Sequence, residues 1–516
     1  MVGVVCQVLF LSLAFAVRTV FIQTLTGEYL GLTSLFSSVI TLLDLTELGL
    51  SEAITFALYQ PIAMQDKPKI ASLIRFYQNA YRMVGIAVLF FGLIMMPFLP
   101  WVIRGSTDLI NVYFVYAMYL AQTVFSYWFL AYKRVLLTAS QSEYLVSFST
   151  GLSKIVTSVL QIGALWGFRD SPETAFYFFV GLGILSTLCV NFMTAAIADR
   201  QFPFIKQQDP TEIPSWERKA IFKNIFGSAI YKICLAVNSS MSNILISAYV
   251  SLTAVGLYAN YMLLHRGVAT LLGALYRPFT ASIGNLNVLE SREKKEFIFG
   301  CLHLLTFWIS GICGVGMWVL FNPFVGGLWL DKNWLLSFPE VATIVLKFWV
   351  DVCMGPVIWF REAAGLFWKA RYRYILTLVV NLGASIYLVA VLDMGILGVL
   401  VGSLISDLVR IVIDPIIVFD HVFQKSPWKF YRTYFLSLAL AVGTAILVQN
   451  ICSLWDAYTA SGFVMATVAC LVMPNLLWWL LFHRDQEYQY LTGIAGMIVR
   501  EKLIAWMKDK KRVQEN

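Results

Sequence analysis

Charged residues are scarce in this chain of 516 residues, at 13%, whereas hydrophobic residues reach 59% and the mean hydropathy is +0.73. Long polar segments are also missing, so no soluble domain of useful size fits between the apolar stretches. Such a composition is typical of a polytopic membrane protein rather than of a soluble chain of this length. The scarcity of charge therefore excludes a soluble enzyme or scaffold and places almost the whole chain in a membrane.

Cysteine pairs, histidine clusters and nucleotide-binding loops are absent as well. The eight cysteines are scattered singly without a CxxC pair, and the four histidines are dispersed, which argues against a disulfide framework or a zinc site. His421 and His483 are candidates for a catalytic group at the inner surface, but no catalytic grouping surrounds them. We therefore expect no enzyme, no cofactor and no metal site. A membrane-embedded glycosyl- or acyltransferase remains the alternative, which product formation by the purified protein would reveal.

Fourteen apolar stretches fill the sequence, each about one bilayer long. A hydrocarbon core of ~30 Å requires ~20 apolar residues per helix. Because the segment 1–17 lacks a basic start and a small-residue cleavage site, we assign it to the first span rather than to a signal peptide. The sequence predicts an all-α polytopic membrane protein with about 14 transmembrane helices. The predicted spans are 2–24, 30–58, 83–103, 110–131, 143–167, 174–196, 226–249, 255–280, 297–322, 338–360, 374–392, 396–419, 434–450 and 461–482.

Positive charge gathers on alternate connections. One set, which includes the tail after residue 482, holds 28 of the 38 Lys and Arg residues, and the other set holds only Arg104, Arg169 and Lys332. The positive-inside rule places the first set, and with it both termini, in the cytoplasm. This location also accounts for the net charge of +8, so we expect membrane lipids and no nucleic acid as partners.

A weak internal repeat divides the chain. Glu28-Tyr-Leu-Gly31-Leu opens the second span, and Thr253-Ala-Val-Gly256-Leu opens the eighth, at an offset of 225 residues. Repeated lobes around a central cavity are a common transporter plan. We expect two six-helix lobes plus two C-terminal helices. The expected parts are an N-terminal lobe at 1–200, a cytoplasmic linker at 201–225, a C-terminal lobe at 226–420, two helices at 421–482 and a basic amphipathic tail at 483–516.

Four of the seven cations inside predicted spans are candidate site residues, because an ionisable group there costs at least ~2.5–3.5 kcal/mol and usually faces protein or a wet cavity. They are Arg18, Lys154, Lys232 and Arg266. None has an acidic residue three or four positions away on its own helix. We predict that they bind an anion across the cavity. Pairing with Asp44 or Glu47, or snorkelling to an interface, is the structural alternative.

The second span carries a polar stripe on one helical face, at steps of three or four residues. Asp44 and Glu47 in this stripe are candidates for ion coupling, because two nearby carboxylates raise the pKa of one of them. Balancing Arg18 or Lys154 is the equal alternative. Asn238 and Asn243 in the seventh span extend the candidate polar path or bond helix to helix. The stripe consists of Thr33, Ser37, Thr41, Asp44, Glu47 and Ser51.

Other embedded charges have opposite charges on their own helix. Lys347 and Asp351 are spaced i,i+4, and Asp407, Arg410 and Asp414 follow at steps of three and four. These spacings predict intrahelical ion pairs rather than binding sites.

Several segments resemble one known family. They are Arg18-Thr-Val-Phe-Ile, Glu28 to Phe36, Leu45 to Ile54, Tyr132 to Gln141, Ala254 to Tyr261, and Phe279 to Asn285. Together they are similar to the polysaccharide repeat-unit flippases (Wzx-like sugar translocases) of the multidrug/oligosaccharidyl-lipid/polysaccharide exporter superfamily. The similarity covers most of the chain and fades after about residue 450. One departure is that this chain opens directly in the first span, where family members usually begin with a short basic segment.

The resemblance implies fourteen helices in two lobes and a cationic cavity, which Arg18, Lys154 and Arg266 would supply. It implies export of an undecaprenyl-diphosphate-linked oligosaccharide across the bacterial cytoplasmic membrane, for capsule, exopolysaccharide or O-antigen synthesis. The lipid-linked oligosaccharide is then the substrate, with a polysaccharide polymerase and chain-length proteins as further partners. A drug/cation antiporter of the same superfamily and a peptidoglycan-precursor flippase are the rival readings. A cation pump favours unpaired acids in its cavity, whereas unpaired cations are at least as prominent here.

Overall fold

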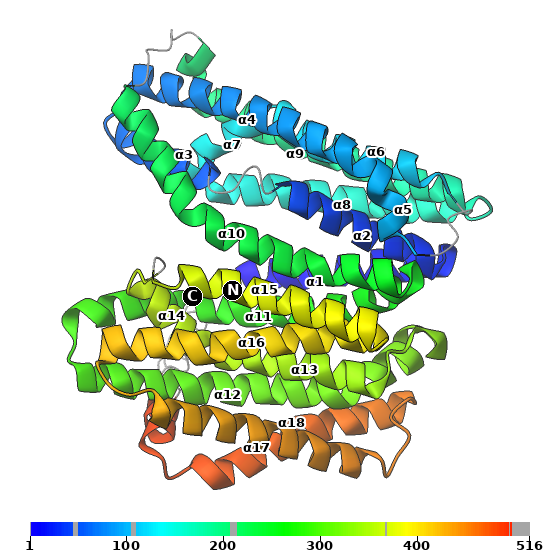
Figure 1. Cartoon of the computed structure of the whole chain (residues 1–516), viewed down its shortest axis with the longest axis vertical. Coiled ribbons are helices and arrows are strands. Elements are labelled where there is room, and N and C mark those ends of the chain that lie inside the picture. Colours follow the sequence, from blue (N-terminus) through cyan, green and yellow to red (C-terminus); the bar gives the residue numbers. More distant parts are fainter. Residues whose placement is uncertain are drawn as a thin grey trace, which may run out of the picture. The chain divides into compact units, whose positions relative to one another are not determined.

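The computed structural model describes residues 2–44, 50–104, 110–206, 214–366, 369–494 and 496–497. This described part consists of helices and their connections and contains no β-strand (Figure 1). The predicted all-α class is therefore confirmed. The longer helices are α1 (Val2–Thr24), α2 (Gly27–Leu43), α3 (Leu50–Ala63), α4 (Lys67–Met95), α6 (Val112–Trp128), α8 (Glu143–Gly167), α9 (Pro172–Gln201), α10 (Ser215–Tyr249), α11 (Leu252–Leu289), α12 (Arg292–Pro323), α13 (Phe338–Cys353), α15 (Arg371–Ile386), α16 (Gly395–Val418), α17 (Trp428–Cys452) and α18 (Ala460–Phe482).

Each of the fourteen predicted spans falls on one of these helices or on a consecutive pair. Within the described ranges, nine helical segments are long and apolar enough to cross a bilayer, or ten with the pair Val112–Trp128 and Ala131–Ala139, which bends by 47°. α10 and α11 are also long, at 35 and 38 residues. The predicted second span corresponds to α2 and α3, between which residues 45–49 lie outside the described part.

The chain forms two compact units. Unit 1 comprises residues 1–267 and 374–406, and unit 2 comprises 268–373 and 407–516. All three boundaries fall inside helices, namely α11, α15 and α16, so these helices contribute to both units. The expected lobe boundaries at residues 200 and 226 do not coincide with these limits, and the division into lobes stays a prediction. The expected linker and tail lie partly outside the described residues, at 207–213 and after 497.

In unit 1, the two copies of the sequence repeat pack directly against each other. A Cβ on Gly31 would lie 2.0 Å from the Leu252 carbonyl oxygen, and a Cβ on Gly256 would lie 2.5 Å from the Gly27 carbonyl oxygen. Real Cβ atoms do not approach backbone this closely, so only glycine fits at either position. The N-terminal ends of α2 and α11 are therefore in backbone contact.

Aromatic side chains fill the interior of unit 2. Phe299 on α12 makes edge-to-face contacts with four other phenylalanines, at centroid distances of 5.4 to 5.7 Å. Such offset and T-shaped pairs match the aromatic quadrupoles and add to the burial of apolar surface. Gly311 and Gly314 leave room on the same helix for Trp478 and Trp349, whose indoles lie where a Cβ would be. The four phenylalanines are Phe360, Phe419, Phe423 and Phe430.

Candidate functional site

A cavity of about 760 Å³ lies among α3, α4, α6, α7 (Arg134–Ala139), α8 and α9 of unit 1. Most of the residues that line it have polar side chains although these helices are mostly apolar, so the polar side chains of six elements converge on one space. Hydroxyl groups dominate, joined by one amide, two cations and one carboxylate. The polar lining residues are Ser51, Thr55, Tyr77, Tyr81, Ser126, Tyr127, Arg134, Thr138, Glu143, Thr150, Lys154, Ser186, Thr187 and Asn191.

Hydroxyl groups on one wall are already arranged by hydrogen bonds. The Ser51 hydroxyl lies 2.6 Å from the Tyr77 hydroxyl and 2.9 Å from that of Tyr81. The Tyr127 hydroxyl donates to the Asp44 carboxylate at 3.1 Å. Asp44 thus contacts the cavity wall, which places one predicted ion-coupling residue beside the site. A wall of oriented hydroxyls is suited to hydrogen bonding with the hydroxyls of a sugar.

Two cations supply the positive charge of the cavity. Lys154 on α8 is exposed to it, and its ammonium lies 5.7 Å from the Phe10 ring centroid, a cation–π distance. Among the described residues, no carboxylate lies within ion-pair distance of Lys154. The only lining carboxylate recorded there, Glu143, accepts a hydrogen bond from Thr138 at 2.6 Å and lies 4.0 Å from Arg134. The cavity therefore has one cation that is available to an anionic ligand.

Arg18 and Arg266 lie elsewhere in unit 1 but near each other. Arg18 on α1 is half-buried, its Nη1 atom is buried without a hydrogen-bond partner, and Arg266 is close enough to interact with it electrostatically. Arg266 on α11 is exposed. Two like charges in one region are unfavourable unless an anion or solvent compensates them. In the described part neither arginine lines the 760 Å³ cavity, and their role in binding an anion across a cavity stays a prediction.

The remaining predicted site residues have different surroundings. Lys232 is half-buried on α10. The Asn243 amide donates to Ser38 on α2 at 2.9 Å, so it bonds helix to helix. Asn238 accepts a hydrogen bond from Asn381 on α15. Glu47 lies outside the described residues, and its predicted role stays a prediction.

Sequence reasoning missed most of the cavity lining. Arg134 follows a loop, and hydroxyl residues inside a span are usually taken as helix–helix contacts. One signal was available: Thr150 and Lys154 on α8, and Thr187 and Asn191 on α9, are spaced i,i+4 and therefore share one face of otherwise apolar helices. That spacing marks polar stripes as clearly as the stripe in the second span.

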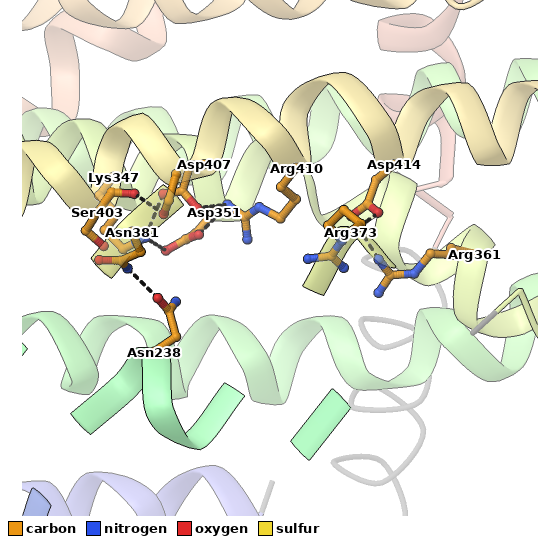
Figure 2. A network of polar contacts seen from close by, with 11 residues as sticks. Asn238, Lys347, Asp351, Arg361, Arg373, Asn381, Ser403, Asp407, Arg410 and Asp414 are labelled. Atoms are coloured by element: carbon orange, nitrogen blue, oxygen red, sulfur yellow. Dashed lines mark hydrogen bonds and ion pairs between the residues drawn. The ribbon is translucent and has the colours of Figure 1, made fainter. Parts of the chain in front are cut away.

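The embedded charges of unit 2 form the predicted intrahelical pairs Lys347–Asp351 and Asp407–Arg410, and they form shorter pairs between helices in addition (Figure 2). Lys347 on α13 lies 2.6 Å from Asp407 on α16 but 3.9 Å from Asp351 on its own helix. Arg410 on α16 lies 2.5 Å from Asp351 and 3.3 Å from Asp407. The four charges sum to zero, so the cluster joins α13 to α16 as a neutral network.

Asp414 belongs to a second, fully buried group in unit 2 and not to Arg410 (Figure 2). Its two carboxylate oxygens lie 2.8 Å from Arg361 and 3.1 Å from Arg373. Both arginines are buried, and the side chain of Asp414 is 0% exposed. One carboxylate therefore holds α14 (Gly355–Ala363) and the start of α15 to α16, a structural arrangement rather than a binding site.

The fold and the cavity define a polytopic all-α membrane protein with a polar internal space. No protein-family model matches the chain, and no curated protein matches it. An inward-facing multidrug resistance MATE family transporter of the MOP superfamily superposes with a TM-score of 0.58 at 13% identity, over 86% of this chain and 99% of that one. The lipid II flippase MurJ, in an inward closed conformation, superposes with a TM-score of 0.63 at 12% identity, over 92% and 99%.

A MATE in a bent conformation also superposes, with a TM-score of 0.51 at 16% identity over 86% of this chain. The chain thus has the fold that these transporters and the flippase share. At such identities the likeness concerns the fold alone. The finer resemblance to polysaccharide repeat-unit flippases stays a prediction.

Proposed function

We propose that this protein is a flippase that moves an undecaprenyl-diphosphate-linked oligosaccharide from the inner to the outer leaflet of the bacterial cytoplasmic membrane. The product would supply capsule, exopolysaccharide or O-antigen synthesis. The observation that carries the proposal is the 760 Å³ cavity of unit 1, which combines a hydroxyl-rich lining with the available cation Lys154. The shared fold with transporters and a flippase supports the class.

The chemistry of the cavity suits the two parts of such a substrate that need help in crossing. The polyprenyl tail stays in lipid, whereas the diphosphate and the glycan must leave water. Lys154 and Arg134 replace water around the diphosphate, because Arg and Lys form short, strong hydrogen bonds with phosphate oxygens. The tyrosine, serine and threonine hydroxyls and Asn191 contact the sugars. The site therefore offers a polar surface of the right chemical kind for each part.

Arg18 offers a second position for the anion. Its Nη1 atom is buried without a hydrogen-bond partner, and Arg266 is its electrostatic neighbour. A buried charged donor without an acceptor lowers the stability of the folded protein by about 1–3 kcal/mol or more. A phosphate group passing this pair would supply the acceptor that the Arg18 Nη1 atom lacks. Arg18 and Arg266 are thus proposed as a second anion site, and Lys232 as a further cation on the same unit.

The driving force has two possible sources. Moving two negative charges outward runs with an inside-negative potential and gains ~2.3 kcal/mol per charge per 100 mV if each crosses the whole field. Asp44, which contacts the cavity wall through Tyr127, and Glu47 provide the alternative of proton or sodium coupling. Export that persists unchanged in Asp44→Asn and Glu47→Gln, with the same ion dependence, would leave the potential as the driving force.

The test is a deletion strain scored for surface polysaccharide and for lipid-linked repeat units by leaflet. We expect complete units trapped on the inner leaflet and no surface glycan, both restored by the wild-type gene. Incomplete units would indicate an enzyme. Unchanged polysaccharide with altered drug sensitivity would favour a drug/cation antiporter, and accumulated peptidoglycan precursor would favour a flippase for that lipid. A polymerase and chain-length proteins are the expected downstream partners.

A further inference from the structure

Unit 2 contains a cavity of about 520 Å³ at one end of three packed helices, α12, α17 and α18 (Figure 1). Glu293 and Lys429 lie in the first turns of α12 and α17, and Phe482 is the last residue of α18. The segment Asp485–Glu487, just after α18, closes the remaining side. The cavity therefore lies where helix ends meet the polar connections, at the level of lipid headgroups.

Negative charge dominates the lining of this cavity. The lining contains one ammonium group, that of Lys429, and four carboxylates. The carboxylates are those of Glu293, Glu296, Asp485 and Glu487. Lys425, which is outside the lining, pairs with Glu296 at 2.5 Å. Even with that pair counted as neutral, carboxylates outnumber ammonium groups in the described lining, so the cavity favours a cation.

A glycine allows one of these carboxylates to reach the helix surface. A Cβ on Gly300 would lie 3.3 Å from the Glu487 Oε1 atom, and Gly300 itself lines the cavity. A larger residue at position 300 would shift this carboxylate by a few tenths of an ångström. His303 follows one turn later on the same face of α12, so Glu487 and His303 border adjacent parts of the cavity.

His303 also indicates a ligand, independently of the carboxylates. It lines the cavity, is 5% exposed, and neither of its ring nitrogens makes a hydrogen bond of normal geometry; the Cys353 backbone is close enough to interact with the ring only weakly. A neutral imidazole offers one donor and one acceptor, and leaving them unmade in a buried place is costly. A ligand with an N–H or O–H group would satisfy the acceptor nitrogen.

The other walls are apolar and continue into a groove. Phe299, Phe419 and Phe430 are each about 5% exposed or less and form the aromatic side of the cavity. Leu304 lines both this cavity and an apolar groove of about 210 Å³ bordered by Trp308 and Tyr488. A ligand that fits both spaces has a cationic head and an apolar chain.

We propose that this cavity binds the headgroup of a membrane phospholipid that carries a primary ammonium, such as phosphatidylethanolamine. The ammonium is placed among Glu296, Glu487 and His303, each of which can accept one of its N–H groups. Lys429 is the counter-charge for the lipid phosphate, and the groove beyond Leu304 takes part of an acyl chain. The site is separate from the proposed transport cavity and does not depend on the proposed substrate.

The test is native mass spectrometry of the full-length protein in a maltoside detergent, with matched acyl chains on three lipids. These are phosphatidylethanolamine, phosphatidylcholine and phosphatidylglycerol. Phosphatidylcholine has the same net charge as phosphatidylethanolamine but no N–H group to donate. We expect phosphatidylethanolamine to bind at least about tenfold more tightly than either other lipid, the difference that hydrogen bonds to charged groups produce.

Two lining variants and one matched control sharpen the result. Glu487→Gln and His303→Leu should each remove most of this preference, about tenfold, since each deletes one acceptor of the ammonium. Glu290→Gln makes the same change of charge on a residue that pairs with Lys294 at 2.6 Å and does not line the cavity, so it should keep the preference. If His303→Leu fails to fold, Glu487→Gln still decides the question.

Three outcomes would overturn the proposal. Equal binding of the three lipids would show that the ammonium is not recognised. If Glu290→Gln lost as much of the preference for phosphatidylethanolamine as Glu487→Gln does, the preference would depend on the net charge of the protein and not on this cavity. Protection by the soluble amine hexylamine in a thermal-shift assay, without any phosphatidylethanolamine binding, would assign the cavity to a small organic cation rather than to a lipid.

Discussion

Lys154 has the two properties that a substrate-binding lysine inside a membrane protein requires. Its ammonium reaches the 760 Å³ cavity, and the Phe10 ring, 5.7 Å away, borders it without neutralising it. A lysine that only stabilised the fold would lie beside a carboxylate, as Lys133 does with Asp199 at 2.5 Å. The contrast between these two lysines motivates the first prediction.

Replacing Lys154 with alanine should lower export by about tenfold or more, because a hydrogen bond to a charged group contributes ~1.5–3 kcal/mol. Lys154→Arg should retain most export, since the charge and the hydrogen-bond donors remain. Initial rates of repeat-unit appearance on the outer leaflet measure both. Lys294→Ala, on an exposed residue of α12 paired with Glu290, is the control. Normal export by Lys154→Ala at wild-type expression would remove Lys154 from the anion site.

Replacing Asp414 with asparagine should destabilise the protein strongly. The change leaves the buried guanidinium groups of Arg361 and Arg373 without their shared carboxylate, and breaking a buried ion pair typically costs ~3–5 kcal/mol. Titration with SDS in mixed micelles measures the free energy of unfolding of the variant and of the wild-type protein. Glu290→Gln, at a surface pair, should cost less than ~1 kcal/mol. Equal stability of both variants would mean that Asp414 is not the central partner.

At the scale of single residues, the sequence identified which charges are embedded but not their partners. Lys347 and Asp351 satisfy the i,i+4 rule, yet their shortest contacts go to Asp407 and Arg410 on another helix. Spacing along one helix contains no information about which helix arrives beside it. Lys154 could be predicted as a site residue because a charge in an apolar span is conspicuous. Arg134 and the lining tyrosines could not, because their place at the cavity depends on how separate helices pack.

At the scale of elements, the repeat and its packing agree in detail. Gly31 approaches Leu252, and Gly256 approaches Gly27. The 225-residue offset that carries Gly31 to Gly256 also carries Gly27 to Leu252. Reciprocal contacts of this kind are what a two-fold axis produces. We infer that a local two-fold axis relates the start of α2 to the start of α11 within unit 1.

Substituting these two glycines should reveal their reciprocity. Gly31→Ala and Gly256→Ala should each destabilise the protein by about 1–3 kcal/mol, because the added methyl group forces the two backbones apart. The double variant should cost less than the sum, since one separation relieves both clashes. Thermal unfolding of the purified protein measures all three.

Gly163→Ala is the control for this series. Nothing lies within 4 Å of a Cβ at Gly163 on α8, and alanine favours a helix over glycine by roughly 1 kcal/mol. This variant should therefore be neutral or slightly stabilised. Strict additivity of the two interface variants would contradict a shared contact.

The helices themselves were largely predictable, since apolar length sets them. Their interruptions were not: α16 ends in a π-helical turn at Phe419–Phe423, and α12 ends in another at Phe324–Trp329. Pro323 and Pro415 lie at or near these ends, but proline is tolerated in spans when neighbours satisfy the freed backbone groups. Whether a helix breaks there depends on tertiary contacts.

At the scale of the whole molecule, the distribution of Lys and Arg predicts that both termini face the cytoplasm. Fusion of a fluorescent protein to the C-terminus should give fluorescence, and fusion of alkaline phosphatase at the same place should give no activity. Alkaline phosphatase fused into the connection around Lys332 should be active, because few cations hold that connection inside. The opposite pattern would invert the predicted topology.

Transport in reconstituted vesicles should respond to the membrane potential. If the substrate carries two negative charges outward, 100 mV inside-negative favours the step by ~4.6 kcal/mol at full field crossing. A potassium-diffusion potential should therefore raise the extent of outward movement, and its reversal should lower it. Insensitivity to the potential, combined with loss of transport in Asp44→Asn, would favour ion coupling.

The architecture of the whole chain was predictable only to the level of class. Helix number and the presence of a repeat follow from hydropathy and from one short motif. The boundaries of the compact units fall inside α11, α15 and α16, where a continuous helix gives no sign of a change in packing. The expected lobes were delimited at the connections between spans, whereas the compact units are delimited inside helices.

The neutral cluster of α13 and α16 also bears on how the protein is made. Lys347 and Asp351 are 3.9 Å apart on α13, and Asp407 and Arg410 are 3.3 Å apart on α16. Each helix thus has its own weak pair and can leave the insertion machinery as a neutral segment before the other is synthesised. In the folded protein these pairs persist beside the shorter contacts between the two helices. The same four side chains thus neutralise each helix by itself and join the two helices to each other.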